Sequence, residues 1–253
     1  MTTKIALITG ANKGIGLETA RQLGARDMTV LVGARDTERG QAAERALRAG
    51  GADARFVQLE VTDPKSVQRA AEWVGAEFGR LDVLVNNAGT ASVGRRGCPP
   101  SETSLDDMRA VYEINVFGVV AVTNAMLPLL RRSPAARIVN VSSEVGSIAA
   151  QSDPSHPLVQ MPASVPYPSS KAALNMVTVM YAKELGGTPI KVNAANPGFT
   201  ATDFNDHRGF RAAAEGAEPS VYLATLPDDG PSGIHWGYIW DGEGKGGYGV
   251  IDW

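Results

Sequence analysis

Short apolar runs that favour strands alternate with longer segments of helical periodicity over most of the chain. The runs share a nearly continuous apolar character and are Lys4–Thr9, Thr29–Ala34, Ala54–Leu59, Asp82–Asn86, Arg137–Ser142 and Lys191–Asn196. The helical segments that follow them are Ile15–Ala25, Thr37–Ala49, Pro64–Phe78, Leu105–Leu130 and Tyr167–Leu185. Strands that are apolar on both sides are typical of a parallel sheet covered by helices on both faces. The alternation therefore predicts a doubly wound, mostly parallel α/β sheet with right-handed crossovers.

Composition gives no sign of a second domain. The 253 residues are 43% hydrophobic and 20% charged, with no repeat and no break in composition, so a single domain over 1–253 is expected. Two segments depart from the pattern. Ala149–Pro166 is rich in Pro, Ser and Ala and is expected to be a loop. The tail from Pro227 carries three of the four tryptophans, which favours packing over disorder, with one short strand at Trp236–Trp240.

Charge and residue usage exclude several classes of function. A net charge of −3 argues against a nucleic-acid partner, and the apolar run Ile5–Ile8 is too short for a signal sequence or a membrane span. The single cysteine, Cys98, cannot form an internal disulfide and has no evident base nearby. The three histidines lack the spacing of metal ligands and are His156, His207 and His235. We therefore expect a cytoplasmic protein without a membrane partner or a catalytic metal.

A glycine-rich turn follows the first predicted strand directly. It reads Thr9-Gly10-Ala11-Asn12-Lys13-Gly14-Ile15-Gly16, and a helix begins within it. Glycines are needed where the backbone turns tightly, approaches a pyrophosphate and lets a helix pack against a strand. The N-terminus of the helix offers free N–H groups to phosphates. An ordinary glycine-rich turn is the alternative, but the position favours a Rossmann-type dinucleotide site.

The spacing Gly-x-x-x-Gly-x-Gly resembles the opening motif of the short-chain dehydrogenase/reductase family. Further matches follow in the family's order: Asn86-Asn87-Ala88-Gly89, Asn115, Ser143, Tyr167 with Lys171, and Pro197-Gly198 with Thr200 and Thr202. A Tyr-x-x-x-Lys pair alone would be weak evidence, but the ordered set is specific. The resemblance implies that the cofactor is held by Gly10, Asn12, Lys13, Gly14, Ile15, Gly16, Asn87, Ala88, Gly89, Tyr167, Lys171, Pro197, Gly198, Thr200 and Thr202.

The residue after the second strand indicates which nicotinamide cofactor is used. Arg35 stands where a 2′-phosphate would bind, and Lys13 in the glycine-rich turn resembles the family's second marker for NADP. We therefore expect NADPH rather than NADH. Asp36 leaves an alternative open, since a shift of one residue would place an acid at the ribose. The resemblance also implies adenine contacts from Glu60 and Val61, although the family usually has Asp at the position of Glu60.

The implied chemistry is reversible reduction of a carbonyl group. Tyr167 would be the acid–base, and Lys171, one helical turn away, would lower its pKa and hold the nicotinamide ribose. Ser143 would orient the substrate oxygen, with the adjacent Ser142 as the alternative. Asn115 would hold a relay water or, alternatively, satisfy backbone groups at a helix irregularity. Thr200 and Thr202 would contact the nicotinamide carboxamide, with the alternative that one of them only starts the next loop.

The segment 148–166 resembles an insertion found in carbonyl-reductase-like members, and 203–218 is expected to be a substrate loop. The substrate would be a small ketone or aldehyde. We expect Val159, Met161, Phe199 and Phe204 to line an apolar pocket, although all four are also compatible with a core. Both a monomer and a homo-oligomer are compatible with the sequence. The alternative functions are a nucleotide-sugar epimerase or dehydratase, a halohydrin-dehalogenase-like enzyme, and a non-catalytic NADP-sensing or scaffold protein.

Overall fold

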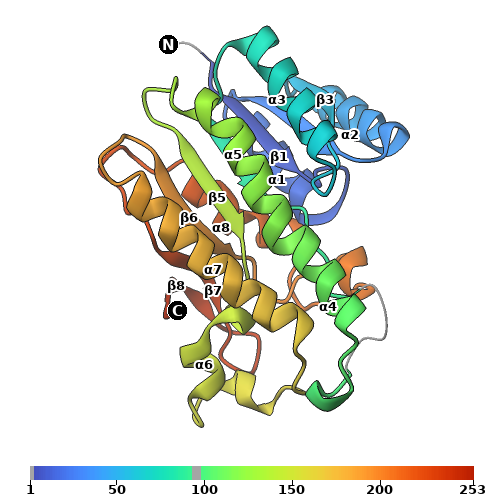
Figure 1. The fold of residues 1–253 in the computed structure, drawn as a ribbon, viewed down its shortest axis with the longest axis vertical. Coiled ribbons are helices and arrows are strands. Elements are labelled where there is room, and N and C mark those ends of the chain that lie inside the picture. Colours follow the sequence, from blue (N-terminus) through green and yellow to red (C-terminus); the bar gives the residue numbers. More distant parts are fainter. Residues whose placement is uncertain (1–2, 93–97) are drawn as a thin grey trace.

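The computed structural model describes residues 3–92 and 98–253, which form one eight-stranded sheet with helices on both faces (Figure 1). The strands are β1 (Ile5–Thr9), β2 (Thr29–Ala34), β3 (Ala54–Gln58), β4 (Val83–Asn86), β5 (Arg137–Val141), β6 (Lys191–Asn196), β7 (His235–Ile239) and β8 (Gly247–Ile251). The helices are α1 (Gly14–Gly24), α2 (Thr37–Ala49), α3 (Pro64–Phe78), α4 (Leu105–Tyr112), α5 (Gly118–Leu130), α6 (Ile148–Ser152), α7 (Pro166–Glu184) and α8 (Ala213–Ala224). The predicted doubly wound α/β fold is confirmed.

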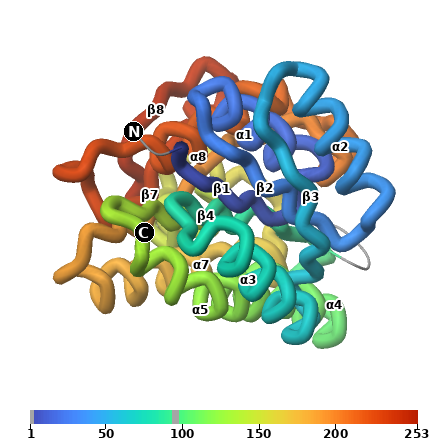
Figure 2. Tube along the Cα trace, turned by 90° about the horizontal axis from the view of Figure 1, so that it is seen from above, coloured from blue at the N-terminus to red at the C-terminus, as the bar shows by residue number. Residues whose placement is uncertain are grey.

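The order of strands across the sheet is β3-β2-β1-β4-β5-β6-β7-β8, and among the described strands β7 and β8 are the one antiparallel pair. The order reverses direction between β1 and β4, which places a crevice at the carboxyl ends of these two strands. Figure 2 shows α1, α2 and α8 on one face of the sheet and α3, α5 and α7 on the other.

Two apolar cores fill the spaces between the sheet and its helices. Successive residues of a strand point to opposite faces, so Leu7 of β1 joins the core under α3, α5 and α7, while Ala6 and Ile8 join the core under α1 and α8. This arrangement explains why the strands are apolar on both sides. Short polar signals set the helix starts: Asp36 caps α2 by accepting from the Arg39 N–H at 2.9 Å.

The 26-residue helical run Leu105–Leu130 was predicted as one helix and contains a π-helical turn at Glu113–Phe117 between α4 and α5. Among the described residues this is the one helix long and apolar enough to cross a membrane, judged by length and composition alone. Half of its most apolar stretch is buried inside the protein, as in the core helix of a sheet.

Three predictions about the second half of the chain were wrong in part. The segment 149–166 is not entirely a loop, because Ser147 caps α6 and His156 caps a 3₁₀ turn at Pro157–Gln160. The expected substrate loop 203–218 ends earlier, since α8 begins at Ala213. The tail forms two strands rather than one, because β8 folds back on β7 and stacks Tyr248 on Trp236.

Candidate active site

The glycine-rich turn lies at the carboxyl end of β1, where the sheet order reverses. Gly10 and Gly14 have φ values of +64° and +56°, a region that favours glycine. A Cβ on Gly16 would lie 2.4 Å from Asn87 Nδ2 and 2.6 Å from the Gly10 carbonyl oxygen, so no larger residue fits there. Because α1 begins at Gly14, its first N–H groups have no acceptor within the helix and are available to an anion. The half-buried Asn12 and Ile15 complete the turn.

The segment after β4 is fastened to this turn. Asn87 Nδ2 donates to the carbonyl oxygens of Thr9 at 2.8 Å and Gly10 at 3.2 Å. Thr9 Oγ1 accepts from the N–H groups of Asn87 and Ala88, both at 2.9 Å. The structure therefore brings the expected cofactor residues of the first and fourth strands together. Thr9 belongs to the motif, but its role as the fastener was missed, since nothing local in the sequence indicates it.

The end of β2 exposes both Arg35 and Asp36, but the two side chains make different contacts. The Arg35 side chain is 75% exposed and lies 3.8 Å from the Glu60 carboxylate, whereas the Asp36 side chain is committed to capping α2. This geometry favours Arg35 over the alternative that an acid binds the ribose. The Glu60 carboxylate also accepts from the Thr62 N–H and hydroxyl, at 3.2 and 3.0 Å. The Val61 side chain is buried against Gly118.

Lys13 pairs with a different carboxylate from the one beside Arg35. Its Nζ lies 2.8 Å from Asp203 Oδ2. The reason is that Thr202 packs on the turn, with its Cγ2 3.3 Å from the position of a Cβ on Gly14, which brings Asp203 beside Lys13. The loop after β6 thus reaches the glycine-rich turn.

The four expected catalytic residues meet between β5, α7 and the π-helical turn. Ser143 follows β5, and Tyr167 and Lys171 lie in the first turns of α7. The Ser143 side chain lies beside the Tyr167 phenol, close enough to act on its pKa. The buried Lys171 donates from Nζ to the Val141 carbonyl oxygen at 2.7 Å, and the same Nζ lies 5.5 Å from the centre of the Tyr167 ring.

Asn115 is fully buried, and protein groups occupy its side-chain amide. Oδ1 accepts from the Thr90 N–H at 2.9 Å, and Nδ2 donates to the Thr90 carbonyl at 2.9 Å and to Ser170 Oγ at 3.0 Å. Oδ1 also lies 3.3 Å from the Cβ position of Gly89. These contacts favour the second of the two roles considered for this side chain, which is to satisfy backbone groups and fix the strand-end loop.

The two adjacent serines make different contacts, which favour Ser143 over Ser142 as the working residue. Ser142 Oγ is buried and donates to Asn175 Oδ1 at 2.5 Å, so it faces the buried side of α7. Ser143 faces Tyr167 on the opposite side of the chain. The turn after Ser143 packs closely against α7 because residue 146 is glycine. A Cβ on Gly146 would lie 2.7 Å from the Lys171 carbonyl carbon.

The expected effect of Lys171 on the Tyr167 pKa is wrong for this structure. Desolvation raises the pKa of Tyr167 to about 12, and the hydrogen bond with Ser143 opposes this rise only in part. Burial lowers the pKa of Lys171 to about 7. The prediction assumed a full ammonium charge beside the phenol, whereas here Nζ is engaged by the Val141 carbonyl and desolvation dominates. At neutral pH Tyr167 therefore carries its proton, as a proton donor must.

The turn after β6 is shaped by internal hydrogen bonds. Gly198 has a φ of +71°, and the buried Thr200 donates to the carbonyl oxygens of Pro197 and Gly198, both at 3.2 Å. Thr200 is therefore used to hold the turn, and Thr202 is the one that contacts the glycine-rich turn. Between the two possible cofactor contacts, the geometry favours Thr202.

A cavity of about 960 Å³ opens beside Tyr167. Val159 and Met161 line it, as expected, together with Val145 and Cys98. Phe204 is not in its lining but packs on the Tyr167 ring, with the ring centres 5.7 Å apart. Phe199 packs on Phe210 instead. Within residues 3–92 and 98–253, no group of three His, Cys, Asp or Glu could hold a metal ion.

Comparison with known proteins defines the family. Residues 4–211 match the family model described as short chain dehydrogenase, and the chain therefore belongs to the short-chain dehydrogenase/reductase family. It is 38% identical over 230 residues to the short-chain dehydrogenase anuI of Penicillium roqueforti, covering 89% of this chain and 90% of that one. It is 33% identical to salutaridine reductase of Papaver bracteatum, covering 91% and 93%.

Two solved structures share the whole architecture. NADPH-bound carbonyl reductase from chicken fatty liver superposes with a TM-score of 0.82 at 30% identity, covering all of both chains. Salutaridine reductase from Papaver somniferum gives a TM-score of 0.79 at 30% identity, covering 92% of this chain and 99% of that one. Members of the family are oxidoreductases that use a nicotinamide cofactor, and the glycine-rich turn described above fits such a group.

Proposed function

We propose that this oxidoreductase uses NADPH to reduce a ketone or aldehyde to an alcohol, with Tyr167 as the proton donor. The observation that carries the proposal is that Tyr167, with the Ser143 side chain beside its phenol, lines the 960 Å³ cavity. Its hydroxyl is protonated at neutral pH, and the buried amine of Lys171 lies beside its ring. The reductases among the relatives and structural neighbours support the same class of reaction.

Each residue has a role that its contacts support. The cofactor, when bound, supplies a hydride for the carbonyl carbon. Ser143 donates a hydrogen bond to the substrate oxygen and stabilises the charge that develops there. Tyr167 would transfer its phenolic proton to that oxygen, and Lys171 would hold the nicotinamide ribose. Asn115 positions the loop after β4 through Thr90.

Binding of the cofactor uses the backbone more than the side chains. The pyrophosphate would lie on the first N–H groups of α1, beside the tight turn that Gly10, Gly14 and Gly16 make possible. Gly89 and Thr202 border the same crevice. The preference for NADPH rests on Arg35, whose exposed guanidinium can receive a 2′-phosphate with two parallel hydrogen bonds.

A non-catalytic NADP-sensing protein on the same fold remains the second candidate, but Ser143, Tyr167 and Lys171 are all present and adjacent, which favours an enzyme. We further propose that the enzyme acts on small molecules in the cytoplasm, in line with its single cysteine and its net charge of −3.

The test is NADPH oxidation with a panel of aldehydes, cyclic ketones and aromatic ketones, by the wild type and by Tyr167→Phe. We expect the wild type to reduce at least one class, and Tyr167→Phe to lose about a thousandfold in kcat while binding NADPH with unchanged affinity. Equal rates for the two proteins on every reducible compound would refute the role of Tyr167. Tight NADPH binding without turnover on any compound would favour the sensing function.

A further inference from the structure

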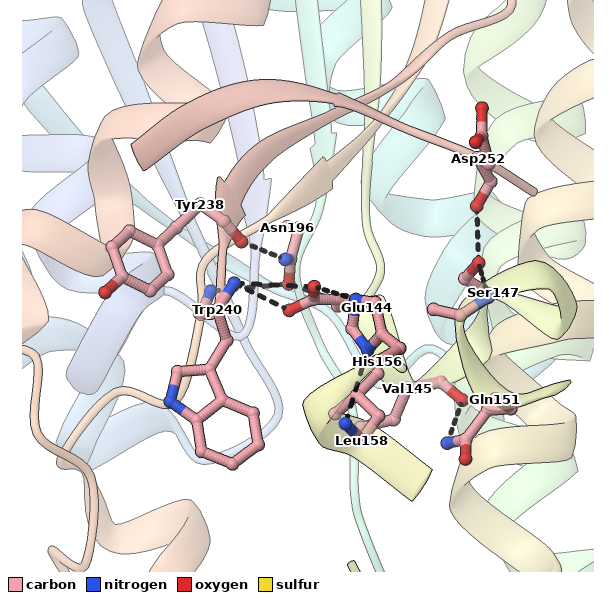
Figure 3. A network of polar contacts seen from close by, with 12 residues as sticks. Glu144, Val145, Ser147, Gln151, His156, Leu158, Asn196, Tyr238, Trp240 and Asp252 are labelled. Carbon is pink, nitrogen blue, oxygen red and sulfur yellow. Dashed lines mark hydrogen bonds and ion pairs between the residues drawn. The ribbon is translucent and has the colours of Figure 1, made fainter. Parts of the chain in front are cut away.

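A buried carboxylate lies one residue beyond Ser143. Glu144 begins the 3₁₀ turn Glu144–Gly146 and is only 5% exposed. Its oxygens accept from the Trp240 backbone N–H at 3.2 and 3.4 Å, and Oε1 lies 3.4 Å from His156 Nε2 (Figure 3). The Glu144 N–H donates to Asn196 Oδ1 at 3.1 Å. None of the roles described above uses this side chain.

The hydrogen bond on the other side of the His156 ring fixes which nitrogen carries the proton. Nδ1 accepts from the Leu158 N–H at 3.2 Å, which requires an unprotonated Nδ1. The ring proton of the neutral histidine therefore resides on Nε2, which faces Glu144 (Figure 3). His156 thus connects the start of the turn Pro157–Gln160 to the turn that follows Ser143.

The residues that follow His156 form one wall of the substrate cavity. Val159, Met161, Pro162 and Ala163 line it, and Val145 lines it from the turn after Ser143. A second contact joins the turn after Ser143 to the segment that leads into the wall, because Gln151 Nε2 of α6 donates to the Val145 carbonyl at 3.1 Å. The position of the wall relative to Ser143 therefore depends on contacts made through Glu144, His156 and Gln151.

We propose that Glu144 and His156 are a pair of positioning residues that fix the cavity wall 157–163 relative to Ser143 and so determine which carbonyl compounds the site accepts. This inference rests on the proposed reductase function. Bulky ketones reach the wall and are sensitive to its place, whereas a small aldehyde contacts mainly Tyr167 and Ser143. Displacing a positioning element by a fraction of an ångström is enough to lower turnover of the substrates that touch it.

The pair also gives the wall a dependence on pH. Burial raises the pKa of Glu144 to about 7, so the carboxylate gains its proton just below neutral pH. A protonated carboxyl has one acceptor fewer, and it cannot hold both the Trp240 N–H and the His156 Nε2–H equally. The other charged or titratable groups on the elements packed around this turn include Asp153, Asp241, Asp252, Tyr167, Lys171 and His235. Because Lys171 also titrates near neutral pH, the ratio of rates for two substrates isolates Glu144 better than either rate alone.

Two substitutions of His156 separate its two contacts. His156→Asn keeps an acceptor for the Leu158 N–H but cannot reach Glu144, whereas His156→Gln keeps a donor toward Glu144 and loses the acceptor near Leu158. Glu144→Gln removes the charge without changing the size of the side chain. Asp153→Asn is the matched control, because Asp153 lies in the same segment and its hydrogen bonds are to Ser155.

The measurement is the ratio of kcat/KM for a bulky cyclic ketone to that for a small aldehyde, from pH 5.5 to 8.5. We expect Glu144→Gln and His156→Asn each to change this ratio about tenfold at pH 8, the double variant to change it no further, and Asp153→Asn and His156→Gln to stay within about twofold. The wild-type ratio should change through pH 7, and that of Glu144→Gln should not. An unchanged ratio in His156→Asn, or an equal change in Asp153→Asn, would overturn the proposal.

Hydrogen exchange separates this proposal from the failure of the reductase function. If the wild type reduces no carbonyl compound, the amides of Leu158, Val159, Gln160, Met161 and Ala163 still report on the pair. They should exchange faster in Glu144→Gln and His156→Asn than in the wild type, while the amides of β4 keep their protection. Equal exchange in all three proteins would overturn the positioning role even in an active enzyme.

Discussion

The two sides of the crevice, the dinucleotide turn and the substrate wall, are built in different ways. The turn after β1 depends on backbone conformation, with positive φ at Gly10 and Gly14 and a close contact between Gly16 and Asn87. The substrate wall depends on side chains from distant parts of the chain, with Glu144 joining His156 to Trp240. The first is a local property of a short motif, and the second exists only in the folded chain.

The largest expected effect is a loss of NADPH affinity, and it tests the dinucleotide turn. Gly16→Val would place a side chain 2.4 Å from Asn87 Nδ2 and 2.6 Å from the Gly10 carbonyl. We expect NADPH affinity to fall more than about a thousandfold, or about 4 kcal/mol, by fluorescence titration. Gly187→Val is the control, because a Cβ at that position meets nothing within 4 Å. Retention of tight binding in Gly16→Val would show that the turn does not hold the cofactor.

The second prediction concerns stability on the substrate side. The pKa of Glu144 is raised from 4.5 to about 7 in the folded protein, so the folded state binds more protons than the unfolded state between these values. Stability therefore falls as pH rises through this window, by at most about 3 kcal/mol. Glu144→Gln removes this loss. Its Tm relative to the wild type should rise by several degrees from pH 4.5 to pH 8, and a difference independent of pH would contradict the burial of this carboxylate.

The third prediction sharpens the cofactor preference. Arg35→Ala should weaken NADPH binding about tenfold, near 1.4 kcal/mol, and leave NADH binding unchanged, because only NADPH has a 2′-phosphate to lose. Both affinities are measured by titration of cofactor fluorescence. Arg39→Ala, in the first turn of α2, is the comparison variant. A similar loss for both cofactors would mean that Arg35 acts on the fold and not on the phosphate.

The smallest expected effect is a loss of stability in an Asp36 variant. It separates capping of α2 from recognition of the cofactor ribose at the end of β2. Asp36→Ala removes the acceptor for the Arg39 N–H and should cost about 1 kcal/mol of stability in urea unfolding. The ratio of NADPH to NADH affinity should not change. A shift toward NADPH in this variant would indicate that Asp36 reaches the ribose after all.

The comparison also explains how much of the molecule the sequence could reveal. The strands and most helices follow from local periodicity, and β2, α2, α3 and β6 have the predicted bounds. The glycine-rich turn and the Tyr167–Lys171 pair lie in short motifs, so their residues could be named in advance. Helix α8 was missed, because Pro219 and the short stretch from Ala213 gave no strong pattern.

Contacts between distant segments could not be predicted in this way. Lys13 pairs with Asp203, 190 residues away, and no local pattern relates the two. Glu144 looks like a surface acid in the sequence, yet β7 and the segment around His156 cover it. The predicted direction of the Tyr167 pKa shift was wrong for the same reason. That pKa depends on how far folding removes the phenol from water and not on the spacing to Lys171.

The central claim is that a hydride passes from the nicotinamide to a carbonyl carbon beside Tyr167. The most direct test is turnover with NADPH that carries deuterium on the transferable side of C4, followed by mass spectrometry and NMR of the alcohol. The account predicts one deuterium on the carbinol carbon with the wild type and almost no product with Tyr167→Phe. Alcohol without deuterium from either face of C4, or full turnover by Tyr167→Phe, would contradict it.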